Sequence, residues 1–160
     1  MDPIVKKRVL RLLTYGLYIM TVRDGNEVAA GTVTWLSQAS FNPPLIMTAV
    51  KVESGLHALI EKTGQFAVNI LAKDQKDIAA AFFKPSRIEN DTINGYPFEP
   101  GPETGAPLLL DLPAWFEARV LEAVKRGDHT VFVAEIIAVG MRTPEAIPLA
   151  LRDTGWSYGG

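Results

Sequence analysis

The chain contains no cysteine among its 160 residues. This absence excludes disulfide bonds, thiolate nucleophiles and zinc–thiolate centres. Its two histidines are too few to indicate a transition-metal cluster, so the sequence predicts no metal site. A chain without disulfides is typical of a reducing compartment, and we therefore expect a cytoplasmic protein.

An excess of basic residues is also missing. Lys and Arg total 16 against 18 for Asp and Glu, which gives a net charge of −2. A generic nucleic-acid surface needs a basic excess, so nucleic acid is not an expected partner. The chain has no apolar run near the ~20 residues that span a bilayer, and its first residues lack a signal-peptide pattern. A membrane is therefore not an expected partner either.

What is present predicts a single domain over residues 1–160, with 48% hydrophobic residues available for a core. Strand patterns outnumber helix patterns, and hairpin signals such as Asp24-Gly25-Asn26 are more frequent than βαβ units. The residues predict an antiparallel barrel or sandwich with two or three short helices packed around it. We expect these helices to begin at Asp2, Ser54 and Asp74, the first of them ending near Gly16.

Residues 84–113 differ from the rest of the chain because they hold six of its 11 prolines and show little periodicity. A loop of this length in a compact domain is usually a lid, a subunit contact or a mobile arm, and all three interpretations stay open. Two long strands are predicted after it, over 115–125 and 129–139. In the C-terminal tail, Trp156 and Tyr158 are expected in core or subunit contacts.

The stretch "GTVTWLSQASFNPPLIMTAV", residues 31–50, is unusually polar in its first half. Its irregular part, 34–40, leaves backbone groups without a regular strand partner. A flat heterocycle with alternating donors and acceptors could pair with them, and a bulge followed by a turn is the alternative.

The predicted helix at Ser54 offers a second candidate site. A helix N-terminus presents unpaired N–H groups and the positive end of the helix dipole, which together favour an anion such as phosphate. Lys51 precedes it, Gly55 allows close approach, and His57 follows one turn later. The alternative is an ordinary helix cap with a solvent-facing His57.

His129 is the third candidate, because it begins a long apolar strand directly after Gly127-Asp128 and so would lie at a barrel rim. A rim histidine can bind a substrate by a hydrogen bond or act as an acid or base near neutral pH. It can equally do no more than cap a turn.

These three candidates coincide with three motifs: "GTVTWLSQASFNPPL" (31–45), "SGLH" followed by "GQFAVNIL" (54–57 and 64–71), and "GDHTVFVAEI" (127–136). Together, and in this order, they resemble the flavin reductase-like, FMN-binding split-barrel family from about residue 10 onward. The resemblance implies a six-stranded antiparallel Greek-key barrel with peripheral helices, usually a homodimer, with the flavin at the barrel edge near the dimer interface.

The resemblance also implies roles for residues. The flavin ring would meet Thr34, Trp35, Leu36, Ser37 and Ser40, and Val50 and Lys51 would run beside the ring and the ribityl chain. Ser54 and His57 would hold the phosphate, with Asn69 and Phe83 as further flavin neighbours. His129 would position the nicotinamide. Many reductases of the family have Thr where this chain has His57, which would make phosphate affinity sensitive to pH.

The function that the resemblance implies is an NAD(P)H:flavin oxidoreductase, which passes hydride from nicotinamide C4 to flavin N5 and takes FMN in preference to FAD. A monooxygenase or another redox protein would be its partner. Residues 13–18 also resemble reductase modules fused to flavodiiron proteins. Two alternatives stay open: a non-enzymatic FMN electron carrier that receives electrons from a protein, and a structural or ligand-sensing barrel with a vestigial pocket.

Overall fold

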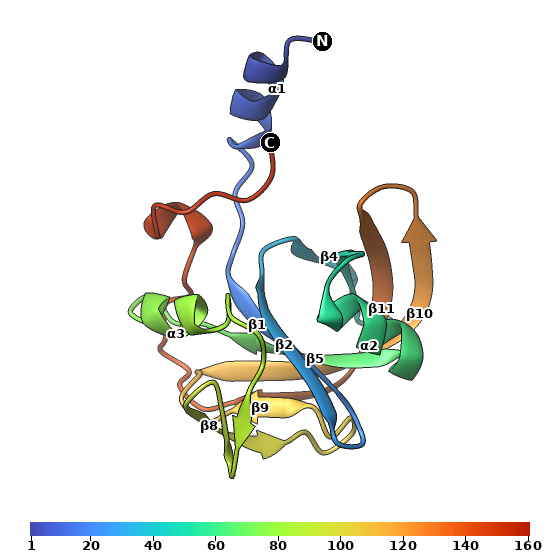
Figure 1. Ribbon diagram of the computed structural model, residues 1–160, viewed down its shortest axis with the longest axis vertical. Coiled ribbons are helices and arrows are strands. Elements are labelled where there is room, and N and C mark those ends of the chain that lie inside the picture. The colour runs from blue at the N-terminus through green and yellow to red at the C-terminus, as the bar shows by residue number, and fades with distance from the viewer.

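The computed structural model describes all 160 residues and shows a curled antiparallel sheet with helices at its ends (Figure 1). The main sheet has seven strands in the order β2-β1-β5-β10-β11-β4-β3. Their bounds are β1 Tyr18–Asp24, β2 Glu27–Val33, β3 Leu36–Ser40, β4 Leu45–Lys51, β5 Gln65–Ile70, β10 Ala114–Lys125 and β11 His129–Met141. The helices are α1 Pro3–Leu10, α2 Gly55–Thr63 and α3 Lys76–Ala81, with a short 3-10 helix at Leu151–Asp153.

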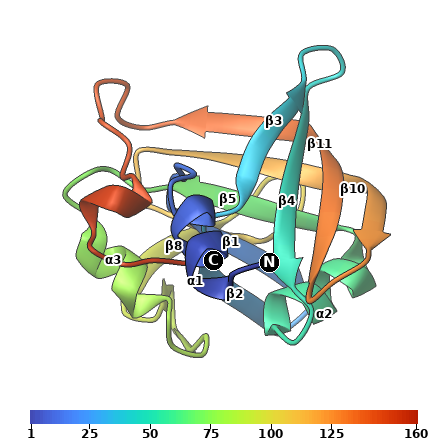
Figure 2. The ribbon, with the colours of Figure 1, turned by 90° about the horizontal axis from the view of Figure 1, so that it is seen from above.

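The two edge strands of this sheet, β2 and β3, are consecutive in the sequence and are separated only by Thr34 and Trp35. The sheet therefore curls into a split barrel, which is visible from above in Figure 2. The mainly β, antiparallel fold is confirmed. The main sheet has seven strands where six were expected, because the ladder is interrupted at Thr34 and Trp35 and resumes as a separate strand.

The predicted hairpin at Asp24 joins β1 to β2, and Asp24 pairs with Glu27 across a two-residue turn. Gly25 is at φ 58°, the left-handed conformation that such a turn requires and that glycine adopts without strain. Fourteen buried side chains, among them Met20, Phe66 and Phe132, fill the barrel. A second cluster of 11 lies under α3 and the C-terminal segment.

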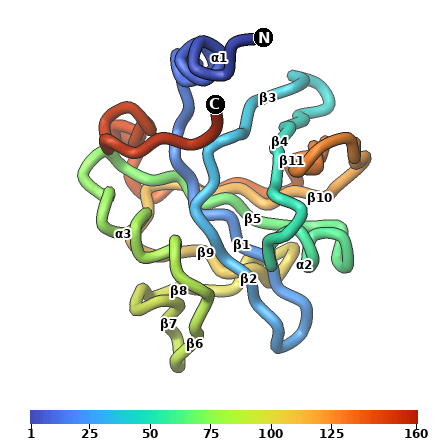
Figure 3. Tube along the Cα trace, turned by 45° about the horizontal axis from the view of Figure 1, so that its top comes forward, coloured from blue at the N-terminus to red at the C-terminus, as the bar shows by residue number.

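Residues 84–113 are more regular than the sequence indicated. They contain four short strands, β6 Ile88–Glu89, β7 Thr92–Ile93, β8 Tyr96–Pro100 and β9 Pro107–Leu109, which form a small second sheet at the far end from α1 (Figure 3). Leu108 and Leu109 are at most 1% exposed. The buried carboxylate of Glu117 on β10 accepts hydrogen bonds from the backbone N–H groups of Glu103 and Thr104. These contacts hold the segment against the barrel.

The first helix is shorter than expected, because α1 ends at Leu10 and the chain then extends toward β1. Asp2 caps it, as predicted, by accepting hydrogen bonds from the N–H groups of Ile4 and Val5. No residue of α1 is buried, and the helix stands away from the barrel (Figure 1). None of the helices combines the length and apolar character needed to cross a bilayer.

Candidate functional site

A cavity of about 650 Å³ opens at the split of the barrel. Its walls are β2 with the following Thr34 and Trp35, the end of β4, the start of α2, residues 82–86, and Tyr158 from the C-terminal tail. The small side chains of Ala29, Ala30 and Gly31 line the β2 side. A Cβ added at Gly31 would lie 3.0 Å from Leu56 Cδ1, so even an alanine there would crowd the cavity wall.

Two polar atoms at this cavity are buried without a hydrogen-bond partner: Thr34 Oγ1 and the indole Nε1 of Trp35. Buried polar groups in folded proteins are almost always paired, and an unpaired one needs an explanation. A neighbouring hydroxyl shows the contrast, because Thr32 Oγ1 donates to the carbonyl oxygen of Ala79 at 2.7 Å. Both residues line the cavity, which makes them candidate contacts for a molecule bound there.

The start of α2 forms the basic end of the cavity. Ser54 caps this helix: its Oγ accepts from the N–H of His57 at 3.1 Å and donates to the carbonyl of Lys51 at 2.7 Å. The first N–H groups of any helix lack a partner inside it and favour an anion. Lys51 and Lys84 are the only charged residues that line the cavity, and both are basic. The sequence identified Lys51 but not Lys84.

His57 does not line the cavity, and its predicted contact with a phosphate is corrected by the structure. The side chain is 7% exposed, and its Nε2 lies 2.7 Å from Thr130 Oγ1 and 3.8 Å from Glu61 Oε1. Its ring centre is 5.7 Å from that of Phe132 in the barrel core. The physical reason is helical spacing: His57 is three residues before the fully buried Ile60 and shares its inward face.

Asn69 is another predicted flavin neighbour that lies elsewhere. Its side chain is 0% exposed, and its Nδ2 donates to the carbonyls of Ile19 at 3.2 Å and Pro107 at 3.3 Å. Its Oδ1 accepts from the N–H of Leu109 at 2.8 Å. Asn69 therefore fastens β9 to the barrel, and it does not line the cavity.

The remaining predicted flavin contacts divide between the cavity and its surroundings. Val50, Lys51 and Phe83 line it, as do Thr34 and Trp35. Leu36 and Ser37 line a neighbouring depression of about 370 Å³ that shares Trp35 and Ala49 with the cavity. Ser40 lies at the end of β3 beside Phe41, in a separate depression, so the structure does not bring it to the cavity.

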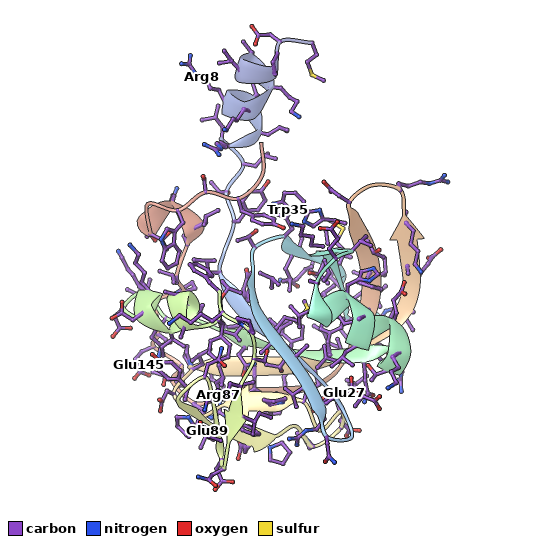
Figure 4. The ribbon with its side chains drawn as sticks, viewed as in Figure 1. Arg8, Glu27, Trp35, Arg87, Glu89 and Glu145 are labelled. Carbon is purple, nitrogen blue, oxygen red and sulfur yellow. The ribbon has the colours of Figure 1, made fainter.

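His129 lies at the start of β11, as predicted, and forms a cluster with three other residues. Its Nδ1 is 2.7 Å from Asp128 Oδ1, its Nε2 is 2.6 Å from Tyr158 Oη, and its ring centre is 4.6 Å from that of Trp35. Figure 4 shows Trp35 at the end of the barrel below α1. The hydrogen bond from His129 lowers the pKa of Asp128, and burial raises the pKa of Tyr158. His129 therefore touches the cavity through Trp35 and Tyr158.

Comparison with known proteins decides the family. Residues 10–157 match the model of the flavin reductase like domain. The chain belongs to this family. It is 33% identical over 150 residues to the NADH-dependent flavin reductase StyB of Pseudomonas fluorescens, covering 91% of this chain and 81% of the relative. It is 29% identical over 137 residues to an NADH-dependent FAD reductase of Streptomyces globisporus, covering 85% and 75%.

A solved structure agrees with this assignment. The styrene monooxygenase flavin reductase of Pseudomonas putida S12 superimposes on this flavin reductase-like domain with a TM-score of 0.74 at 30% identity, covering 91% of each chain. Two longer relatives contain a matching region, and the chain spans 43% and 21% of their lengths. The family inferred from the three motifs is confirmed.

The cavity fits a flavin by the chemistry of its lining. Apolar side chains, including Val50 and Leu56, offer a surface for a flat ring, and the backbone and side chains of Thr34 and Trp35 lie beside it. Lys51 and the start of α2 offer positive charge for a phosphate. Sequence reasoning missed Lys84 and Tyr158, because neither lies in a motif and both reach the cavity through the tertiary fold.

Proposed function

We propose that this protein is an NAD(P)H:flavin oxidoreductase whose flavin binds in the cavity at the split of the barrel. The observation that carries the proposal is the cavity itself, whose apolar lining lies beside Thr34 and Trp35 and meets Lys51 and the N-terminus of α2. When bound, the flavin supplies the atom that accepts a hydride from the nicotinamide ring. No side chain needs to act as a nucleophile.

Different residues would bind the flavin ring, the phosphate and the nicotinamide. Thr34 and Trp35 hold the polar edge of the ring, and Val50 and Phe83 lie along its apolar surface. Lys51, Lys84 and the N–H groups that follow Ser54 bind the phosphate. Leu36 and Ser37 flank Trp35 on its outer side. His129, held by Asp128, positions the nicotinamide; it orients the substrate and excludes water at the reacting end of the cavity.

The structure and the relatives support a specific flavin and a specific electron donor. The cavity has one basic end, at Lys51 and the start of α2, which supports FMN, or the FMN part of FAD, as the group bound. Two relatives are named as NADH-dependent, which supports NADH as the donor. Because one of them is named as an FAD reductase, the released cofactor has to be identified by mass.

We also propose that the reduced flavin serves a separate oxygenase, since a structural neighbour is the flavin reductase of a styrene monooxygenase. The protein itself would act as a homodimer. The exposed apolar side chains Ile4, Val5 and Val9 of α1 support this, as does the depression at Trp35 and Leu36, which is open beside the cavity.

Anaerobic mixing tests the function. Purified protein loaded with FMN is mixed with NADH and, separately, with NADPH, and flavin absorbance is followed. We expect direct bleaching by at least one nucleotide. Protein that binds flavin but is bleached by neither would be an electron carrier that depends on a protein donor, and the proposed enzyme activity would be wrong.

A pair of variants tests the site itself. Replacing Lys51 and Lys84 together by Gln removes the positive charge of the cavity, so we expect FMN affinity to fall roughly tenfold or more in a fluorescence titration. Riboflavin, which has no phosphate, should bind both proteins alike. Lys73→Gln, at an exposed lysine outside the cavity, is the matched control. Equal FMN affinity in all three proteins would reject the phosphate assignment.

A further inference from the structure

The C-terminal tail, residues 155–160, runs back from the short helix at Leu151–Asp153 toward α1 (Figures 1 and 3). Its Tyr158 lines the cavity. No backbone–backbone hydrogen bond holds these residues. The N–H of Trp156 donates to Thr154 Oγ1 at 3.0 Å, and Arg11 Nε donates to the carbonyl of Gly159 at 3.3 Å. The tail is therefore fastened by side chains, a form of attachment that a ligand can displace.

Its aromatic side chains contact residues that line the cavity. Trp156 meets Phe83 edge to face, with ring centres 4.8 Å apart. Tyr158 meets Trp35 in the same manner at 5.1 Å. Such pairs contribute beyond the apolar area they bury. Through Tyr158 the tail forms part of the cavity wall, on the side where His129 lies.

His129 lies between Asp128 and Tyr158. Its Nδ1 is 2.7 Å from Asp128 Oδ1, and because a carboxylate can only accept, Nδ1 donates. Its Nε2 is 2.6 Å from the Tyr158 hydroxyl, within hydrogen-bond distance. Burial and the nearby charge of Asp128 raise the pKa of Tyr158. The ring nitrogen of His129 on the cavity side is therefore already occupied.

We infer that the tail is a strap in which Tyr158 occupies the nicotinamide position at His129, and that NAD(P)H binds only when the tail leaves. This inference rests on the proposed function. A ligand that needs a minor conformation binds with an apparent affinity reduced by the fraction in that conformation. Removing the phenol hydroxyl removes one hydrogen bond that favours the closed form. We therefore expect the equilibrium between closed and open tail to shift about two- to tenfold toward the open form.

The test is Tyr158→Phe, which keeps the ring against Trp35 and removes the hydroxyl. The dissociation constant of NAD⁺ is measured by calorimetry on oxidised, FMN-loaded protein, where no hydride is transferred. We expect the variant to bind NAD⁺ about two- to tenfold more tightly, with a matching fall in KM for NADH. Tyr96→Phe, whose hydroxyl makes no hydrogen bond within the chain, is the matched control and should leave all these values unchanged.

A second measurement follows the tail directly. The chain has no cysteine, so Ser157→Cys, at an exposed position, provides a unique thiol for a spin label. We expect NAD⁺ to increase the mobility of this label. A label that stays immobile while NAD⁺ binds would overturn the strap.

The outcomes separate the strap from the function. If Tyr158→Phe binds NAD⁺ more weakly, Tyr158 is a ligand of the nucleotide; if it binds NAD⁺ equally well, Tyr158 has no influence on nucleotide binding. Either result overturns the strap. The proposed function is upheld in both cases as long as the unmodified protein oxidises NADH. If neither protein binds NAD⁺ or NADP⁺, or oxidises NADH or NADPH, the proposed function fails and the strap with it.

Discussion

At the scale of single residues, Thr34 distinguishes a ligand site from an ordinary turn. Its hydroxyl is buried and unpaired, whereas the hydroxyl of Thr32, two residues earlier and also at the cavity, is bonded to Ala79. A buried polar group without a partner is destabilising, so the free protein carries this penalty at a position that a bound molecule would satisfy.

Thr34→Val should therefore have opposite effects on folding and on binding. The free protein should be as stable as the unmodified one, or more stable by up to about 1 kcal/mol, because the unpaired hydroxyl is gone. FMN affinity should fall about two- to tenfold with the lost hydrogen bond. Urea unfolding and fluorescence titration measure the two effects.

The matched variant is Thr32→Val. It removes a hydroxyl that is already bonded to the Ala79 carbonyl, and should lower the free energy of unfolding by about 1 kcal/mol. If Thr34→Val is as destabilising as Thr32→Val, the hydroxyl of Thr34 has a partner in the free protein and the argument for a ligand there fails.

At the scale of elements, α2 has separate roles at its two ends. Its N-terminus, at Ser54, faces the cavity, and its other end is tied to the barrel by an ion pair between Glu61 and Lys125 of β10. The hydrogen bond from Lys125 is the main reason why the pKa of Glu61 is lowered. This exposed pair links the far end of the helix, whose first turn forms the basic end of the site, to β10.

The lowered pKa of Glu61 predicts a pH dependence with a definite sign. A carboxyl whose pKa is lower in the folded state contributes stability that is present above its unfolded pKa, about 4.3. That contribution is lost as the pH falls through the lower, folded value. Glu61→Gln should therefore be less stable than the unmodified protein at neutral pH, and the difference should shrink below about pH 4.

Urea unfolding curves at pH 7 and at pH 3 check this dependence. Glu145→Gln, at an exposed glutamate that forms no ion pair, serves as control and should show little difference at either pH. A stability difference for Glu61→Gln that is as large at pH 3 as at pH 7 would show that the ion pair is not its source.

At the scale of the whole molecule, the exposed apolar side chains of α1 have no packing partner within a single chain. The helix stands away from the barrel with Ile4, Val5 and Val9 between 54% and 64% exposed. The C-terminal tail touches it only near its end, where a Cβ at Gly160 would meet Lys7. Apolar surface of this kind is typical of a subunit contact.

Replacing Val5 and Val9 together by Gln should weaken the proposed dimer. Burying two valines contributes enough that we expect the dimer dissociation constant to rise roughly tenfold or more. Light scattering across a dilution series measures it, with twice 17.5 kDa as the dimer mass. Lys6→Gln with Lys7→Gln changes the same helix without removing apolar area. An unmodified protein that is monomeric at all concentrations would contradict the dimer.

Much of the architecture could be predicted locally. The Gly25 turn, the Asp2 and Ser54 caps and the start of β11 at His129 all depend on residues a few positions apart, whose chemistry is readable in order. The segment 84–113 could not be predicted in this way. The segment contains four short strands that its many prolines made difficult to recognise in the sequence. Their burial depends on contacts with distant residues, such as the hydrogen bond that Thr21 Oγ1 donates to the Pro107 carbonyl.

The sequence by itself determined that a flavin reductase-like barrel would form and where its motifs would lie. Only the tertiary structure decided which side chains face the cavity. The fold directs His57 and Asn69 away from the cavity and places Lys84 and Tyr158 in its lining. Tyr158 also contacts His129, which lies 29 residues earlier in the chain. The physical reason is that a motif specifies local backbone shape, whereas the direction of a side chain is set by what packs against it from elsewhere in the chain.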